Sequence, residues 1–190
     1  AWLRRSLYGE HAEREAFLHG EPIICLSPVT RSVWDDSQNK VIKQIKLPTA
    51  TEGIVLNAIE VTQTCTVSRI EPLEYTYKIW LVDVQVEGMP GTEKLRLLAP
   101  DVKRQYKEDL EGLRIAALEN NYYWKYFYQL KEFIDDCRVA YGLTVYSSQG
   151  STFDNVFVAG DDIAAVRSQE SRRRGFYVAG SRGSDKIIFS

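Results

Sequence analysis

The sequence predicts an α/β fold, in which helices flank a parallel sheet and a small β-barrel interrupts the domain. Three observations favour this fold. Apolar strands alternate with amphipathic helices near both ends of the chain, a strand-rich block lies between them, and 44% hydrophobic and 26% charged residues are typical of a globular protein of 190 residues. We expect one discontinuous α/β domain, residues 1–47 and 100–190, with an inserted barrel at residues 48–99.

The N-terminal elements are expected to be two helices and one buried strand. Apolar residues at mostly helical spacing predict a surface helix over residues 2–19. The continuous apolar run at residues 22–26 is typical of a strand that is covered on both faces in a parallel sheet. A second helix is expected over residues 31–43, with Thr30 or Ser32 as its N-cap.

The strand-rich block consists of short stretches of β-branched and aromatic residues that Gly and Pro residues separate. Four or five such strands at close spacing predict a small antiparallel barrel. The clearest stretches are residues 51–56, 65–70, 75–84 and 93–98.

Helical spacing returns after Pro100 and predicts helices over residues 101–120 and 121–137. Two strands, at residues 139–146 and 156–158, are then expected on either side of a polar loop. An arginine-rich helix at residues 169–179 and an apolar strand at residues 186–189 complete the α/β pattern.

The charge balance argues against a molecule that binds polyanions over its whole surface. Lys and Arg number 24 against 26 Asp and Glu, so any contact with nucleic acid must come from a local patch. Cys25, Cys65 and Cys137 are isolated in the sequence, which favours reduced, buried thiols over a zinc site. No apolar run has the length of a membrane-spanning helix, so we expect a cytoplasmic protein with no membrane partner. The start at Ala1 without Met suggests a fragment.

The most informative stretch is A-Y-G-L-T-V-Y-S-S-Q-G-S-T-F-D-N-V-F-V, residues 140–158. A strand that stops in hydroxylated residues, Gln and Gly exposes backbone N–H groups and short donors, where a phosphodiester can lie close. Taken alone, a plain polar loop is the simpler interpretation.

The second stretch is F-Y-V-A-G-S-R-G-S-D-K-I-I-F, residues 176–189. An arginine that follows a helix can reach across an interface, and its planar guanidinium suits the charge that develops on a transferred phosphoryl group. Taken alone, Arg182 is better explained as a surface ion-pair partner.

In this order, the two stretches resemble motifs V and VI of superfamily 1 DNA helicases of the RecD/Dda branch, where A-L-T-x-H-K-x-Q-G-x-x-F-D precedes L-Y-V-A-x-T/S-R-A. The resemblance is specific over residues 139–189 and extends less specifically to residues 23–33 as motif IV. The strand-rich block resembles the SH3-like insertion of that branch, with Gly-Ile-Val at 53–55 and Leu-Ala-Pro-Asp at 98–101. The resemblance implies a UvrD-like C-terminal domain with a RecA-like, P-loop NTPase-like fold.

The resemblance also implies a set of site residues and partners. Arg182 matches the catalytic arginine finger, and Thr144 matches a threonine that touches the DNA backbone. The expected partners are single-stranded DNA and an N-terminal RecA-like domain of the same polypeptide, which binds most of the ATP and Mg²⁺. The expected nucleotide-binding residues are Gln149, Gly150, Thr152 and Arg31; the expected DNA-binding residues are Thr144, Tyr146, Ser147 and Ser148; no metal ligand is expected.

Several residues depart from the pattern of this branch. Tyr146 replaces the usual His, Ser147 the usual Lys, and Thr152 a frequent acidic residue; Gly180, Gly183 and Ser184 also differ near motif VI. Two rival interpretations therefore stay open, which are a non-catalytic nucleic-acid-binding or interaction module with a degenerate motor fold, and a plain α/β scaffold.

An absent motif limits the expected activity of this chain. No G-x-x-x-x-G-K-[ST] phosphate loop occurs in it, and we expect the half that carries this loop to precede Ala1. Without the loop, the β- and γ-phosphates of ATP have no holder, so the chain alone should be nearly inactive as an ATPase.

Two further stretches are better explained by structure than by function. The aromatic run at residues 121–128 is expected to pack a helix against the core, although it could stack on bases. The arginines at residues 172–174 are expected to form a solvated face, although they could steer DNA.

Overall fold

The computed structural model describes residues 8–9, 15–37, 39–67, 72–150 and 152–189. The chain forms two compact units, Ala1–Ala140 and Tyr141–Ser190. The domain boundaries predicted near residues 47 and 99 do not coincide with this division and stay predictions.

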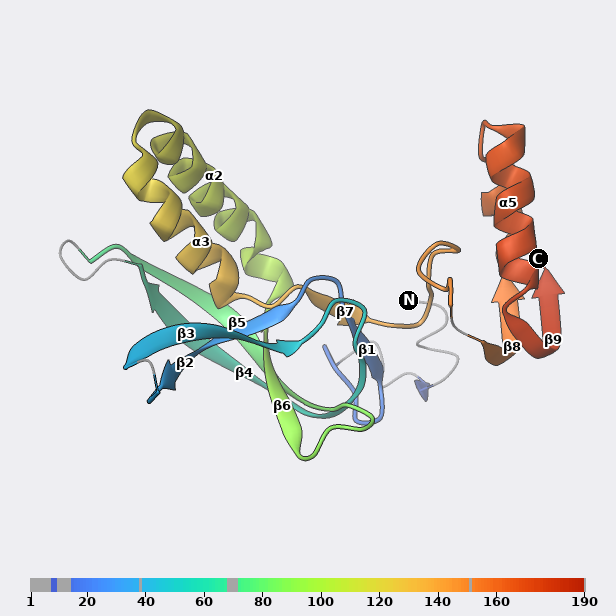
Figure 1. The fold of residues 1–190 in the computed structure, drawn as a ribbon, viewed down its shortest axis with the longest axis horizontal. Coiled ribbons are helices and arrows are strands. Elements are labelled where there is room, and N and C mark those ends of the chain that lie inside the picture. The colour runs from blue at the N-terminus through green and yellow to red at the C-terminus, as the bar shows by residue number, and fades with distance from the viewer. Residues whose placement is uncertain (1–7, 10–14, 38, 68–71, 151, 190) are drawn as a thin grey trace. The chain divides into compact units, whose positions relative to one another are not determined.

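The first unit is built on a five-stranded antiparallel sheet with the strand order β6-β5-β4-β1-β7 (Figure 1). β4 and β5 form a long hairpin, and β6 continues it as a meander, whereas β1 lies between β4 and β7. The strands are β1 (Pro22–Cys25), β4 (Glu52–Thr66), β5 (Glu74–Gln85), β6 (Thr92–Leu98) and β7 (Cys137–Val139).

Alternation of side chains explains why the central strand β5 is buried so completely. Along this strand Tyr77, Ile79, Val82 and Val84 are almost fully buried, while their neighbours are more accessible. The register changes in β4 between Val55 and Asn57, which is a β-bulge. The alternation changes phase between Ile79 and Val82, so Tyr77 and Ile79 enter one core cluster and Val82 and Val84 the other.

A second hairpin, β2 (Val29–Asp35) and β3 (Lys40–Leu47), replaces the helix that was predicted over residues 31–43. That prediction is wrong. Val33, Val41 and Ile42 are β-branched, and such residues favour an extended chain over a helix. The hairpin is also anchored at its base, because Val29 and Leu47 pair and are buried in the core.

Two helices pack on the sheet and agree with the prediction for residues 101–137. They are α2 (Lys103–Glu119) and α3 (Trp124–Phe133), and the short 3₁₀ helices η2 (Pro100–Val102) and η3 (Asn121–Tyr123) precede them. Figure 1 shows both helices on one side of the sheet of this unit. Leu113 of α2 and Leu130 of α3 are buried against Ile79 of β5, so these helices complete a core.

The aromatic run at residues 121–128 contributes to this packing, in agreement with its structural interpretation. The rings of Tyr122 and Tyr126 lie edge to face with centroids 5.2 Å apart, and those of Trp124 and Phe127 lie 5.4 Å apart. Tyr126 is buried in the same cluster as Leu130. Aromatic pairs of this geometry stabilise a helix interface beyond the area that they bury.

The second unit contains a parallel pair of strands joined by helices. β8 (Phe153–Val158) leads through α4 (Gly160–Ala164) and α5 (Gln169–Gly180) to β9 (Gly183–Phe189), which pairs with β8 in parallel. This is a β-α-β unit. Its core consists of Val158, Ile163 and Ala179.

The close contact between α4 and α5 requires a glycine. A Cβ atom at position 175 would lie 3.0 Å from Cγ2 of Ile163. The absence of a side chain at Gly175 therefore sets how closely the two helices approach.

The fold class is confirmed only as a mixed α/β structure. The main sheet is antiparallel, so the predicted parallel RecA-like sheet is not seen, and parallel pairing in the described residues occurs in β8 and β9. No barrel is seen in the described part of the chain either, because the sheet is open, with β6 and β7 at its edges. The apolar run at residues 22–26 does form a buried strand, β1, but its pairing is antiparallel, because an antiparallel sheet can also be covered on both faces.

Three element boundaries also need correction. Most of the predicted helix at residues 2–19 lies outside the described residues, and residues 15–20 are not helical. The strand predicted at residues 65–70 is the end of β4, whose last residue is Thr66, and residues 68–70 lie outside the described part. The strand predicted at residues 139–146 ends at Val139, and turns follow it.

We predict that the core around β5 dominates the stability of the first unit. Ile79→Ala should lower the free energy of unfolding by about 2–5 kcal/mol, because the fully buried side chain leaves a cavity. Ile59 on β4 is 46% exposed, so Ile59→Ala should cost about 1 kcal/mol or less. Urea denaturation followed by circular dichroism measures both values, and equal losses would contradict this assignment of the core.

Candidate nucleic-acid and nucleotide site

The residues that were predicted to contact DNA lie together in one turn. Residues 145–150 form consecutive turns after the extended residues 142–144. The backbone N–H of Ser147 donates to Oγ1 of Thr144 over 3.1 Å, and the Oγ atoms of the two residues are 2.7 Å apart. Gly150 adopts a positive φ of 94°, which a glycine accommodates without strain. The bond from the Ser147 N–H to the Thr144 hydroxyl thus caps the start of the turn.

The side chains of this turn differ in what they present to solvent. The Tyr146 side chain is exposed at 71%. Ser148 is buried, and its hydroxyl donates to the backbone carbonyl of Val145 over 2.8 Å. Ser147 and Gln149 are exposed. The turn thus offers a ring and short polar groups to a ligand, while Ser148 stabilises the turn itself.

Arg182 lies immediately after α5, where its guanidinium contacts the end of that helix. Its Nε donates to the carbonyl of Val178 over 3.3 Å and to Oγ of Ser181 over 3.1 Å, and its Nη2 donates to the same Oγ over 2.8 Å. The last carbonyls of a helix have no partner within the helix, and a cation near them is favourable. The side chain is partly buried in this position.

The structure brings Arg182 next to the start of β8. The backbone N–H of Phe153 donates to the carbonyl of Arg182 over 2.8 Å, although the two residues are far apart in sequence. The hydroxyl of Ser184 donates to the carbonyl of Phe153 and to Oδ1 of Asp154, over 3.3 and 3.1 Å. The two motif-bearing stretches are therefore neighbours, and the exposed Thr152 directly precedes their junction.

Arg31, a predicted nucleotide-binding residue, lies in the first unit and is paired there. Its Nη1 and Nη2 donate to the two carboxylate oxygens of Asp135 over 2.8 and 2.7 Å. Asp135 is 3% exposed at its side chain and also accepts from the backbone N–H of Arg96 over 2.8 Å. The hydrogen bonds to Asp135 raise the pKa of Arg31 above its ordinary value. Its nucleotide-binding role stays a prediction.

The role of Asp135 could not be predicted from the sequence, because this residue is 104 positions from its partner Arg31 along the chain. The carboxylate joins β2 to the segment that precedes β7. Such a buried bidentate pair makes a structural role for Arg31 plain.

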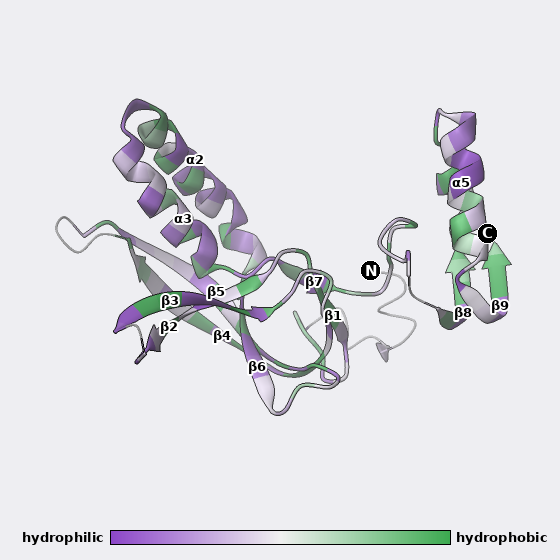
Figure 2. Cartoon of the chain, viewed as in Figure 1, coloured by the Kyte–Doolittle hydropathy of each residue, from purple (hydrophilic) through white to green (hydrophobic). Residues whose placement is uncertain are grey.

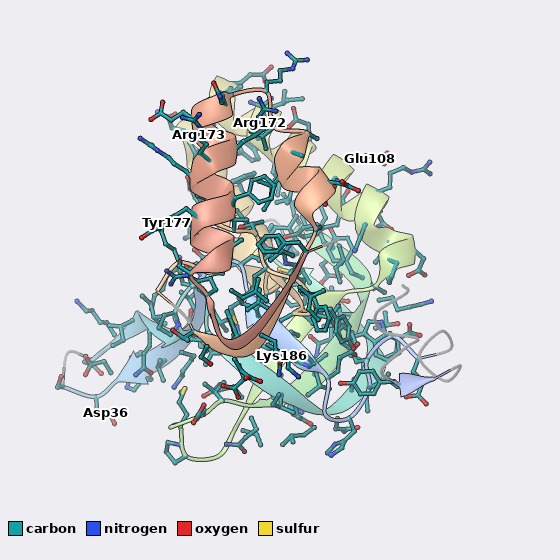
Figure 3. The ribbon with its side chains drawn as sticks, turned by 90° about the vertical axis from the view of Figure 1, so that its right-hand side faces the viewer. Asp36, Glu108, Arg172, Arg173, Tyr177 and Lys186 are labelled. Carbon is teal, nitrogen blue, oxygen red and sulfur yellow. The ribbon has the colours of Figure 1, made fainter. Side chains whose placement is uncertain are left out.

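Arg173 and Arg174 of α5 are exposed, as expected for a solvated face, and Arg172 is partly buried. Arg174 donates to Glu170 over 2.6 Å one helical turn earlier. Arg172 and Arg173 line a shallow pocket with Ala164, Gln169 and Phe176. Figure 3 shows both arginines near the start of α5, with Tyr177 further along it. Tyr177 is 77% exposed, so this helix combines basic and aromatic groups at its surface.

Apolar residues are also exposed on the β-strands of the second unit. Phe157 of β8 is 77% exposed, and Ile188 and Phe189 of β9 are each 49% exposed. Figure 2 shows the hydrophobic character of both strands beside the polar α5. Parallel strands are normally covered on both faces, so these side chains are unusual for such a pair.

Within the described residues, no group of three or more His, Cys, Asp or Glu side chains is placed to hold a metal ion. None of the helices described here is long and apolar enough to cross a membrane.

Comparison with known protein families gives one match. Residues 139–189 match the family described as the UvrD-like helicase C-terminal domain. The match starts at the end of β7 and runs through the turn, α5 and Arg182 to the end of β9. Residues 139–189 thus resemble a helicase domain. The match supports a helicase-related role for this part of the chain. No curated protein matched the chain.

We predict that the Arg31–Asp135 pair is a major stabilising contact of the first unit. Asp135→Ala should lower the free energy of unfolding by about 3–5 kcal/mol, because it leaves a half-buried guanidinium without its carboxylate. Glu132 pairs with Lys43 at the surface, so Glu132→Ala should cost about 0–1 kcal/mol. Urea denaturation compares the two variants, and a small effect of Asp135→Ala would contradict the structural role of the pair.

Proposed function

We propose that this chain is the C-terminal part of an ATP-dependent superfamily 1 DNA helicase of the RecD/Dda-like branch, which translocates 5′ to 3′ along single-stranded DNA in the cytoplasm. The observation that carries the proposal is the match of residues 139–189 to a helicase domain, together with the contact between Arg182 and Phe153 that joins the two motif-bearing stretches. ATP and Mg²⁺ are bound mainly by an N-terminal RecA-like domain of the same polypeptide.

In this proposal, Arg182 is the arginine finger. A guanidinium stabilises the negative charge on the equatorial oxygens of the transferred phosphoryl group, and such residues contribute about 10³–10⁵ in kcat. In the structure Arg182 donates to neutral acceptors, Oγ of Ser181 and the carbonyl of Val178. A phosphate adds a negative charge and accepts two parallel bonds from the guanidinium, which favours the turn of Arg182 towards ATP.

The turn at residues 144–150 supplies the DNA contacts in this proposal. The hydroxyls of Thr144 and Ser147 are exposed and can donate to a phosphodiester. Tyr146 can stack on a base, which compensates in part for the absence of the cation usual at position 147. Gln149, Gly150 and Thr152 connect this turn to the nucleotide side at β8.

The strands β4, β5 and β6 occupy the stretch that resembles the SH3-like insertion of the branch. They form an open meander in this chain instead of a barrel. We propose that this meander is the counterpart of the insertion.

A second candidate function is a non-catalytic nucleic-acid-binding or interaction module. The observation that favours it is Ser147, whose hydroxyl pairs with that of Thr144 and which replaces the lysine usual in the branch. Such a module would bind single-stranded DNA but would not depend on Arg182, so the two functions separate experimentally.

We predict that Arg182 controls hydrolysis and not nucleotide binding. In the polypeptide that includes the phosphate-binding half, Arg182→Ala should lower the kcat of DNA-stimulated ATP hydrolysis by about 10³-fold or more, with the Kd for ATP changed only a few-fold. Arg174→Ala is the matched control on α5, because Arg174 pairs with Glu170 at the surface.

Retention of hydrolysis by the Arg182→Ala protein would exclude the arginine finger. The 190-residue chain alone should hydrolyse ATP at a background rate, since no phosphate loop occurs in it. Strong DNA-stimulated hydrolysis by this chain would also contradict the proposal.

We predict that the chain binds single-stranded DNA through Tyr146. Tyr146→Ala should raise the Kd for a labelled oligonucleotide by about 5- to 100-fold, the loss expected for one stacked base, while Tyr146→Phe should retain binding. Tyr177→Ala removes a tyrosine of similar exposure on α5 and serves as the control. Fluorescence anisotropy at low salt measures these values, and equal effects of Tyr146→Ala and Tyr177→Ala would contradict this site.

A further inference from the structure

The fold brings together two cysteines that the sequence keeps far apart. Cys25 ends β1, and Cys137 begins β7, and these residues face each other across the antiparallel pair. Their Sγ atoms are 3.5 Å apart, with the Cys137 thiol donating to the Cys25 sulfur. The cysteines were predicted to be isolated and buried. All three are free thiols, and Cys25 and Cys65 are buried, but Cys25 and Cys137 are neighbours in space.

The register of the strands places the pair in a favourable backbone geometry. The N–H of Leu26 donates to the carbonyl of Asp136, so Cys25 and Cys137 are a non-hydrogen-bonded pair of the ladder. The Cα atoms of such a pair are about 4.5 Å apart. Disulfides span Cα distances of about 4.4–6.8 Å, so a bond between these sulfurs requires little backbone movement.

Access and acidity differ between the two thiols. Cys25 is 3% exposed, whereas Cys137 is partly accessible on β7, the edge strand of the sheet. The hydrogen bond from Cys137 lowers the pKa of Cys25, and the same bond together with burial raises the pKa of Cys137. Cys65, by contrast, lies in the other core cluster, and burial raises its pKa. Cys137 is therefore accessible to an oxidant, and the buried thiol of Cys25 lies next to it.

We propose that Cys25 and Cys137 are a redox modification site that forms a reversible disulfide with a small-molecule disulfide as oxidant. The accessible Cys137 thiol loses its proton and attacks one sulfur of the oxidant, whose S–S bond breaks and releases one thiolate, which takes up that proton. The Cys25 thiolate then attacks the Cys137 sulfur and expels the second thiolate, which takes up the proton of Cys25. Two protein thiols are oxidised, and one small disulfide is reduced to two thiols.

The disulfide would fix an edge of the first unit. It would join residues 112 positions apart and enclose the segment from β2 to α3 in one covalent loop. Loops of this length restrict the unfolded chain strongly, so the cross-link stabilises the fold. It would also hold β7, which leads into the helicase-like residues, to β1. This inference is independent of the proposed function.

The test oxidises the purified chain with oxidised glutathione and measures its intact mass. The mass should fall by about 2 Da, and a peptide map without reduction should link Cys25 to Cys137. The Tm should rise by about 5–10 °C and return to its initial value after treatment with dithiothreitol.

The cysteine variants provide the controls. Cys137→Ser should abolish both the mass change and the Tm shift, and Cys65→Ser should retain both. Because Cys25 is deeply buried, the test uses Cys137→Ser and does not require that a Cys25→Ser variant folds. A lasting glutathione adduct on Cys137, a link that involves Cys65, or unchanged thiols in the native chain would overturn the proposal.

Discussion

The pairing of β1 on both of its edges is the constraint on which the first unit depends. Four residues, Pro22–Cys25, form ladders with β4 on one side and β7 on the other. β1 thus ties the N-terminal part of the unit to its C-terminal end. Both flanks are reinforced, because Gly53 in β4 allows a close approach to the carbonyl of Gln85, and Asp135 before β7 binds Arg31. Within the sheet, β1 is the strand that connects the meander β4–β5–β6 to β7.

The second unit depends on a smaller set of contacts. Its buried core is three residues, Val158, Ile163 and Ala179, and a unit of this size buries a low fraction of its surface. The exposed rings of Phe157 and Tyr177 are a consequence of that limit. The unit is nevertheless well defined locally. Ser168 caps α5, Gly175 lets α4 approach, and the carbonyl of Arg182 accepts from Phe153.

Elements that depend on residues near one another in sequence were predicted, whereas contacts between residues far apart in sequence were not. The helices α2, α3 and α5 were predictable because the charges and apolar spacing that favour them lie within each segment. The hairpin β2–β3 was missed although its β-branched residues favour strands, and the burial of Val29 and Leu47 that anchors it depends on residues distant in sequence. The contacts of Arg31 with Asp135 and of Cys25 with Cys137 were also not predicted, because these partners are 104 and 112 residues apart along the chain. In the candidate site, residues 144–150 and Arg182 were found through resemblance, because a polar loop and a single arginine carry little information alone.

The environments of two arginines illustrate what structure adds to that resemblance. Arg31 forms two charge-assisted bonds with a carboxylate that is 3% exposed, and removing it from this partner would leave a buried charge uncompensated. Arg182 donates to a hydroxyl and a helix-end carbonyl, and both acceptors can be satisfied by water once the side chain swings away. Exchange of partners is therefore costly for Arg31. This difference shows how strongly the carboxylate of Asp135 holds Arg31 on β2.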